Sequence, residues 1–154
     1  MKNIIYRVAT LKDLPTLYKF EQGIISTERP FDSTLKPDPI NYYDLKELVL
    51  NDNVQVVVAE INNEVISSGH AKIIKGKPYH KHTDYVYLGF MYVKPEYRGQ
   101  GIIKAITETL KAWAKQQNLL EVRLEVYNDN TSAIKAYEKS GFKKHMIEMR
   151  MQIE

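Results

Sequence analysis

The segment 93–103 holds the residue types best suited to chemistry, because two glycines and two cations gather there. Gly99 and Gly101 let the backbone turn tightly and expose successive N–H groups, and a helical pattern follows directly. The first N–H groups of a helix have no partner within it, and the helix dipole adds partial positive charge. With Arg98 and Lys104 beside them, these groups would bind a phosphate or pyrophosphate. A simple connecting turn fits the same pattern.

This loop differs from two common nucleotide-binding motifs. It is not a P-loop, since no Gly-Lys-Ser/Thr follows the glycines. It is not a dinucleotide fingerprint, since Lys104 stands where the third glycine is required. His80 and His82 lie two residues apart, but no further ligand at a fitting spacing accompanies them, so we expect no metal site. The chain has no cysteine, which excludes thiolate nucleophiles and disulfides.

The composition is that of one globular domain. The 154 residues are 44% hydrophobic and 27% charged, which excludes intrinsic disorder. Lys plus Arg (22) exceed Asp plus Glu (19) by only three, too small an excess to indicate nucleic-acid binding without a local patch. No apolar run approaches the roughly 20 residues of a membrane-spanning helix. We therefore expect a single cytoplasmic domain over residues 1–154 that binds neither nucleic acid nor membrane.

The periodicity of apolar residues predicts the elements that position the glycine loop. Strands are expected over 4–8, 54–60, 64–74, 83–93 and 119–127, with a hairpin turn at Asn62-Asn63. Helices are expected after Thr10, after Asp44, over 101–117 and from Asn130 to Lys139. Residues 23–40 predict a long loop, and residues 142–152 predict one strand or a tight pair. This order predicts an α+β fold with a mostly antiparallel sheet flanked by helices.

Two linked motifs resemble the GNAT superfamily of N-acetyltransferases. The first, Arg98-Gly99-Gln100-Gly101-Ile102-Ile103, fits the family's Arg/Gln-x-x-Gly-x-Gly/Ala except at Ile103, where a small residue is usual. The second runs from Asn128 and ends in the family's Tyr-x-x-x-Gly-Phe, here Tyr137 to Phe142. The opening residues 7–15 are also typical, so the resemblance covers almost the whole chain. It implies a GNAT fold, whose sheet splays between its fourth and fifth strands.

The resemblance also implies an acetyl-CoA site along the fourth strand and the loop after it. The pyrophosphate would lie on the glycine loop, at Arg98, Gly99, Gln100, Gly101, Ile102, Ile103 and Lys104. The pantetheine arm would pair with the strand edge near Met91, Tyr92 and Val93, like an added strand. Asn130 would face the cofactor from the turn before the last helix, or would only cap that helix.

Catalytic roles are likewise implied by the resemblance. The family often places a tyrosine at the position of Tyr137, near the cofactor sulfur, so Tyr137 is the implied general acid, with a packing residue as the alternative. Backbone N–H groups near Met91 and Tyr92 would stabilise the oxyanion. The strand lacks the glutamate that many relatives use as a base. His82, Asp84 and Glu125 remain as candidates, and each also fits a solvated surface group.

We therefore expect an N-acetyltransferase that moves an acetyl group from acetyl-CoA to a primary amine by direct attack. The acceptor, a small-molecule amine or a peptide, would be bound by residues 23–43 and by the last strands. Six acids against three bases between Glu21 and Glu47 favour a cationic amine, with an apolar wall of Phe31, Tyr42 and Tyr43. A non-catalytic acyl-CoA sensor and a protein N-terminal or lysine acetyltransferase remain as alternatives. A homodimer is compatible with the sequence.

Overall fold

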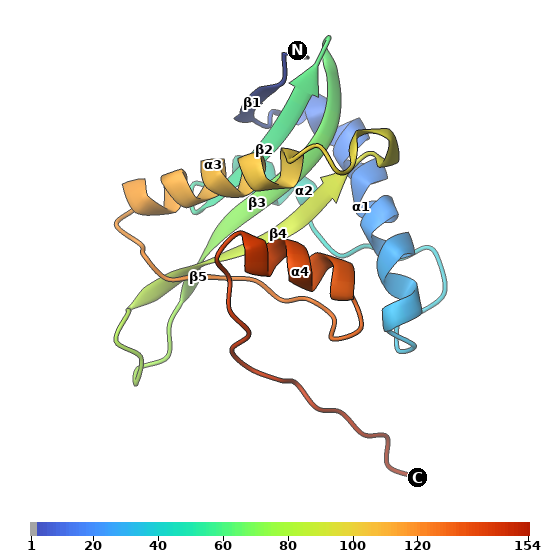
Figure 1. The fold of residues 1–154 in the computed structure, drawn as a ribbon, viewed down its shortest axis with the longest axis vertical. Helices are drawn as coiled ribbons and strands as arrows, with labels where there is room; N and C mark the ends of the chain where they lie inside the picture. Colours follow the sequence, from blue (N-terminus) through green and yellow to red (C-terminus); the bar gives the residue numbers. More distant parts are fainter. Residues whose placement is uncertain (1–2) are drawn as a thin grey trace.

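The fold comes from a computed structural model in which residues 3–154 are described (Figure 1). The strands are β1 (Ile5–Val8), β2 (Val54–Ile61), β3 (Glu64–Lys75), β4 (Asp84–Val93) and β5 (Val122–Arg123). The α-helices are α1 (Leu14–Glu28), α2 (Leu45–Leu50), α3 (Ile102–Gln116) and α4 (Thr131–Lys139). Short 3-10 turns occupy Leu11–Asp13, Arg29–Phe31 and Pro95–Tyr97. Within residues 3–154, no helix is both long and apolar enough to cross a membrane.

The strands form one five-stranded sheet in sequence order, β1 to β5. Every neighbouring pair is antiparallel except β4 and β5, which run parallel because α3 connects them as a crossover. At the β2–β3 hairpin, Asn62 and Asn63 have φ angles of 50° and 64°, which are those of the turn that the sequence predicts. The predicted α+β fold with a mostly antiparallel sheet is confirmed.

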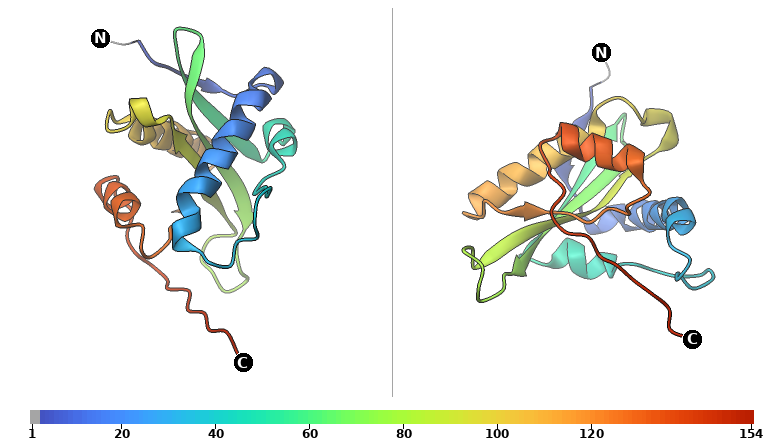
Figure 2. Two further views of the ribbon diagram at one scale, coloured as in Figure 1. Left: turned by 90° about the vertical axis from the view of Figure 1, so that its right-hand side faces the viewer. Right: turned by 60° about the horizontal axis from the view of Figure 1, so that its bottom comes forward.

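The helices cover both faces of the sheet (Figures 1 and 2). On the face under α3, the buried core includes Val57, Ala71, Val86, Leu88, Ile102, Ile106 and Leu110. On the face under α1 and α2, it includes Leu17, Phe20, Leu45, Val56, Val58 and Phe90. The sheet therefore has a packed core on each side, which fixes the position of β4 between α1 and α3.

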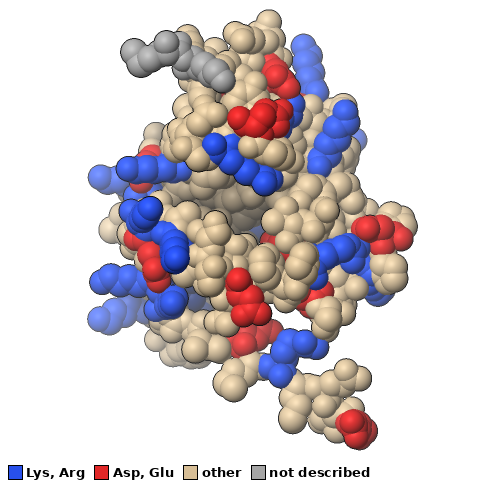
Figure 3. Space-filling view, turned by 45° about the vertical axis from the view of Figure 1, so that its right-hand side comes forward, with Lys and Arg blue, Asp and Glu red and all other residues tan. Residues whose placement is uncertain are grey.

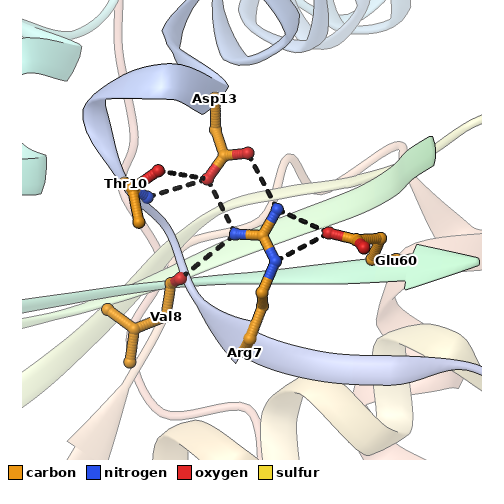
Figure 4. Close-up of polar contacts among 5 residues, drawn as sticks. All are labelled: Arg7, Val8, Thr10, Asp13 and Glu60. Carbon is orange, nitrogen blue, oxygen red and sulfur yellow. Dashed lines mark hydrogen bonds and ion pairs between the residues drawn. The ribbon is translucent and has the colours of Figure 1, made fainter. Parts of the chain in front are cut away.

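Arg7 connects β1 to the start of α1 and to β2 (Figure 4). Its guanidinium donates hydrogen bonds of 2.8 and 2.9 Å to the two carboxylate oxygens of Asp13 and one of 2.7 Å to Glu60. Asp13 also accepts a bond of 2.7 Å from the Thr10 N–H group, as a capping-box acid does. Because Arg7 stabilises the ionised carboxylate, the pKa of Asp13 lies below its usual range.

Helix α1 is longer than the sequence predicts. The expectation of a loop from residue 23 was wrong for 23–28, because the apolar stripe continues through Ile24 and Ile25, both buried. Gly23 does not end the helix but allows a close approach to β4. A Cβ atom there would lie 2.5 Å from the Tyr92 ring. This extension makes Glu28 the last residue of α1.

The predicted strands after residue 118 are shorter than expected or absent. Of residues 119–127, only Val122–Arg123 pair in the sheet, and residues 142–152 form neither a strand nor a hairpin. From Lys143 the chain runs away from the body in an extended path (Figures 1 and 2). A strand needs a neighbour for its backbone groups, and this segment has none in the sheet.

Candidate active site

The site begins where β4 separates from β5. The two strands pair at only two positions, up to Tyr87, and then diverge, which confirms the predicted splay. On its other side β4 shifts register against β3 between Ser68 and His70, so that β4 contains one extra residue. This β-bulge lies at Phe90–Met91, and Phe90 has a φ of 55°. The edge of β4 that faces β5 is therefore unpaired beyond Tyr87. We call the opening between the two strands beyond this point the notch.

Two buried serines of β3 hold the bulge. The Ser67 hydroxyl donates a hydrogen bond of 2.6 Å to the Tyr92 carbonyl, and the Ser68 hydroxyl donates one of 2.9 Å to the Phe90 carbonyl. Both serines are fully buried. They satisfy carbonyl groups that the interrupted ladder leaves without regular partners, so the bulge is a fixed part of the fold.

The bulge changes which side chains of β4 face each core. Leu88 packs in the core under α3, and simple alternation would place Phe90 beside it. Instead Phe90 and Tyr92 pack on the α1 face, and Met91 and Val93 pack on the α3 face. Met91 thereby lines the notch. The family resemblance predicts that the pantetheine arm pairs with this part of β4.

The notch holds a cavity of about 100 Å³ that opens to solvent. Figure 3 shows a hollow near the centre of one face of the molecule, with Lys and Arg side chains along its upper rim. The cavity is lined by Ile24, Glu28, Tyr43, Tyr87, Leu88, Gly89, Phe90, Met91, Leu124, Glu125 and Tyr137. Two carboxylates and three phenols thus share one space, with apolar side chains between them.

Burial shifts the titration of these polar groups. It raises the pKa of the Glu28 carboxyl, which is a stronger base there than in water. It also raises the pKa of Tyr43 to about 12 and the pKa values of Tyr87 and Tyr137 above the usual phenol value. At neutral pH the phenols therefore remain protonated. The cavity combines proton donors with a carboxylate acceptor.

The chain after α1 reaches across the notch to the segment that follows β5. The Tyr127 hydroxyl donates a hydrogen bond of 2.8 Å to the Asp32 carboxylate. The rings of Phe31 and Tyr127 stack with their centroids 6.2 Å apart. Hydrogen bonds from Thr34 and Tyr127 lower the pKa of Asp32. This contact joins the segment that follows α1 to the segment that follows β5.

The glycine loop lies at the start of α3, beside the open edge of β4. Gly99 and Gly101 have φ angles of 74° and 77°, and no atom lies within 4 Å of the place a Cβ would take on either. No side chain caps the helix at Gly101, so its first N–H groups receive no side-chain partner there. The Arg98 side chain donates a hydrogen bond of 3.1 Å to the Val93 carbonyl, and Arg98 is otherwise exposed. These features fit a pyrophosphate.

The remaining predicted cofactor residues differ in exposure and contacts. Gln100 and Lys104 are exposed on the loop, whereas Ile102 is buried and Ile103 packs partly against the core. The Asn130 side chain accepts a hydrogen bond of 3.3 Å from the Ala133 N–H group, so it caps α4. A role for Asn130 at the cofactor stays a prediction.

Of the three base candidates named from sequence, only Glu125 lines the cavity. His82 contacts Arg123 at 3.2 Å, and Asp84 pairs with Lys75 at the opposite end of β4. Glu28 was expected only among the acids of the acceptor loop and not as a base candidate, because residues 23–28 were not predicted to be helical. The spacing of Leu17, Glu21, Ile24 and Glu28 continues the helical period and was the signal that could have found it. Among residues 3–154, no three His, Asp or Glu side chains form a metal-binding group.

Comparison with known proteins identifies the family. Residues 20–142 match the model of the acetyltransferase (GNAT) family. The chain belongs to the GNAT family. It is 32% identical over 99 residues to the probable N-acetyltransferase camello of Xenopus laevis. The aligned residues cover 64% of this GNAT chain and 43% of that relative. The chain spans less than half the length of the curated relatives it matches.

Solved structures share the GNAT fold. A predicted acetyltransferase from Clostridium acetobutylicum, solved with acetyl-CoA, has a TM-score of 0.77 at 22% identity, covering 97% of this chain and 96% of that one. An aminoglycoside antibiotic 6'-N-acetyltransferase from Acinetobacter baumannii has a TM-score of 0.72 at 17% identity, covering 99% and 100%. Acetyl-CoA is the acyl donor of the family.

Proposed function

We propose that this GNAT chain transfers the acetyl group of acetyl-CoA to a small primary amine. One observation carries the proposal: Glu28 and Tyr137, a carboxylate base and a phenol acid, line the same cavity at the point where β4 and β5 separate. The unpaired edge of β4 leads from this cavity to the glycine loop. A donor bound along that edge would present its thioester to both groups.

The donor site is supported by the contacts of the loop and the strand. The N–H groups at Gly99 and Gly101 and the start of α3 would hold the pyrophosphate, with the Arg98 guanidinium beside it. The pantetheine arm would take the place of a strand along Met91 to Val93. The Val93 carbonyl already accepts a hydrogen bond from Arg98. We therefore assign the backbone N–H groups of this edge as the donors that stabilise the thioester oxygen.

The chemistry requires one base and one acid. The amine arrives as an ammonium ion, and Glu28 accepts its proton, which its raised pKa favours. The neutral nitrogen then attacks the thioester carbonyl carbon. As the C–S bond breaks, Tyr137 donates its proton to the departing sulfur, so that CoA leaves as the thiol. The nitrogen loses its extra proton as the amide forms, and this proton returns to the Tyr137 phenolate, while Glu28 releases its proton to water. The second cavity acid, Glu125, would attract the cationic acceptor to the mouth.

The shape of the cavity favours a small amine over a polypeptide. The cavity is small, aromatic side chains line it, and the contact between Asp32 and Tyr127 joins the segments after α1 and β5. A polypeptide substrate also needs a groove beside the cavity for the residues that adjoin its reacting amine. The acids Glu28, Asp32 and Glu125 at or near the cavity favour a cationic acceptor.

A thiol-release assay over a panel of small amines and short peptides tests the proposal. We expect CoA release that depends on a small amine and falls when Glu28 is replaced by Gln. Release with peptides alone would show a protein acetyltransferase. Tight CoA binding without release for any acceptor would show the non-catalytic sensor, whose main argument was the missing strand carboxylate.

A further inference from the structure

Glu21 is a buried carboxylate of α1 that the proposed chemistry does not use. It lies on the same stripe of the helix as Ile24 and Glu28, which line the cavity. Glu21 is only 1% exposed, and its Oε2 atom accepts hydrogen bonds of 3.0 and 2.8 Å from the Tyr42 and Tyr43 N–H groups. The other oxygen, Oε1, is buried and has no hydrogen-bond partner in the described part of the chain. A buried carboxylate that is only half satisfied is unfavourable for the fold, so stability alone does not explain this residue.

Residues 40–43 depend on α1 for their position. They lie between α1 and α2 and belong to no helix or strand, so no regular hydrogen-bond pattern fixes their backbone. Besides the two bonds to Glu21, the Gln22 side chain donates a hydrogen bond of 2.9 Å to the Ile40 carbonyl. The segment therefore returns beside α1 on its way to α2 (Figure 2). Two neighbouring side chains of one helix hold it there.

Tyr43 connects this anchored segment to the cavity. Its side chain lines the cavity, and its ring packs edge-on against the rings of Phe90 and His70 at centroid distances of 5.3 and 5.7 Å. Phe90 lies at the β4 bulge. A tyrosine side chain has few rotatable bonds, so fixing its backbone restricts where its ring can lie. The bond from the Tyr43 N–H group to Glu21 therefore fixes one wall of the cavity.

We propose that Glu21 is a positioning residue for the acceptor, which holds the backbone at Tyr42 and Tyr43 so that the Tyr43 ring forms one wall of the amine site. This inference rests on the proposed function, because it concerns the acceptor side of the same cavity. Glu21 does not line the cavity itself, so it acts through Tyr43 and not on the reacting atoms. Its loss should weaken the binding of the amine and spare that of acetyl-CoA.

Steady-state kinetics of Glu21→Leu, with the amine and acetyl-CoA varied in turn, tests this role. Leu has no acceptor oxygen, and a displacement of about 1 Å in a positioned group can lower a rate by about 10²-fold, so we expect KM for the amine to rise at least about fivefold. KM for acetyl-CoA should stay within about twofold, because its binding needs no contact with this wall. Glu21→Gln keeps a carbonyl oxygen that can accept both N–H bonds, so it should restore KM for the amine. The matched control is Asp13→Asn, which changes another buried carboxylate at the start of the same helix and should leave both KM values unchanged.

Three outcomes of these kinetics would overturn the proposal: equal rises in both KM values, an unchanged KM for the amine, or a Gln variant that behaves like the Leu variant. A double-mutant cycle tests whether Glu21 acts through Tyr43. In the Tyr43→Ala background, Glu21→Leu should raise KM for the amine no further, and additive effects would contradict the proposal. If circular dichroism shows that Glu21→Leu does not fold, Gln22→Ala loosens the same segment from an exposed position. An unchanged KM for the amine in that variant would then overturn the proposal.

Amide hydrogen exchange, followed by nuclear magnetic resonance without substrates, separates this inference from the proposed function. The Tyr42 and Tyr43 N–H groups should exchange at least about tenfold faster in Glu21→Leu than in Glu21→Gln, because only Gln can still accept their hydrogen bonds. Equal exchange rates would overturn the inference whatever the activity of the protein. No acetyl transfer to any amine by the unaltered protein would refute the proposed function, whereas transfer with an unchanged KM in Glu21→Leu would refute only the role of Glu21.

Discussion

Replacing Tyr137 by Phe tests the acid assigned to the leaving thiolate. CoA leaves from a thiol whose pKa is roughly 8.5 by analogy with cysteine, so at pH 7 its departure is assisted by a proton donor. Burial raises the pKa of Tyr137, which keeps the phenol protonated and available. General acid catalysis contributes about 10²–10⁴-fold, or roughly 3–5 kcal/mol of barrier. We expect kcat to fall by at least about tenfold, because water can replace the phenol in part.

The structure supplies the control for this variant. The Tyr137 ring packs edge-on against Phe142 at a centroid distance of 5.9 Å, and Phe keeps that contact, so stability and the Kd for CoA should change little. Tyr87→Phe removes another buried phenol from the same cavity and should leave kcat nearly unchanged. Steady-state kinetics and a calorimetric CoA titration give the measurements. If kcat of Tyr137→Phe stays within about twofold, far below the general-acid range, the thiolate leaves without this acid and Tyr137 only packs.

Three further predictions concern the glycine loop, the base and the fold. Gly101→Val should weaken CoA binding in calorimetry, while the strain of a left-handed residue lowers stability by only about 1–2 kcal/mol. The control is Gly141→Val outside the glycine loop, where φ is 97°: it also places Val in the left-handed region and should bind CoA normally. Glu28→Gln should lower kcat/KM for the amine with an unchanged KM for acetyl-CoA, and equal effects on both substrates would contradict this role. In the unaltered enzyme, the acidic limb of the pH profile of kcat/KM should have an apparent pKa above the ordinary carboxyl value of about 4.3, since Glu28 acts only when ionised. Asp13→Asn should lower the free energy of unfolding by about 1.5–3 kcal/mol at pH 7. Because the pKa of Asp13 is depressed in the fold, its contribution is complete above the unfolded value of about 3.9 and is lost as the pH falls through the folded value, so a difference in urea titrations that does not shrink as the pH falls below about 3.9 would refute it.

The elements with strong local signals could be predicted from the sequence. The hairpin at Asn62-Asn63 and α3 lie within one or two residues of their expected bounds, because turn chemistry and a 3.6-residue period are local properties. The glycine loop was placed correctly for the same reason. The end of α1 was not, since Gly23 usually weakens a helix, and only its contact with Tyr92 explains why it is kept.

The candidate site depends on contacts that no local pattern encodes. Glu28 enters the cavity because α1 is longer than expected, and Asp32 meets Tyr127 across 95 positions of sequence. The bulge at Phe90 depends on hydrogen bonds from a different strand. Residues 142–152 show the opposite case: the sequence predicts one strand or a tight pair there, but these residues pair with no strand of the sheet.

The extra residue in β4 changes the alternation of its side chains, and this determines how the strand responds to insertion and deletion. Residues before the bulge face the α3 core at even positions, and residues after it do so at odd positions. Deleting Tyr87 would turn Val86 out of the α3 core and bring Tyr85 into it, whereas deleting Phe90 would only remove the bulge and leave Met91 and Val93 on the α3 face. Substitutions along β4 act one side chain at a time, whereas a deletion outside the bulge would invert the strand on one side of it. Diversification of this strand in a family of such enzymes should therefore proceed by substitution and keep the length fixed outside the bulge.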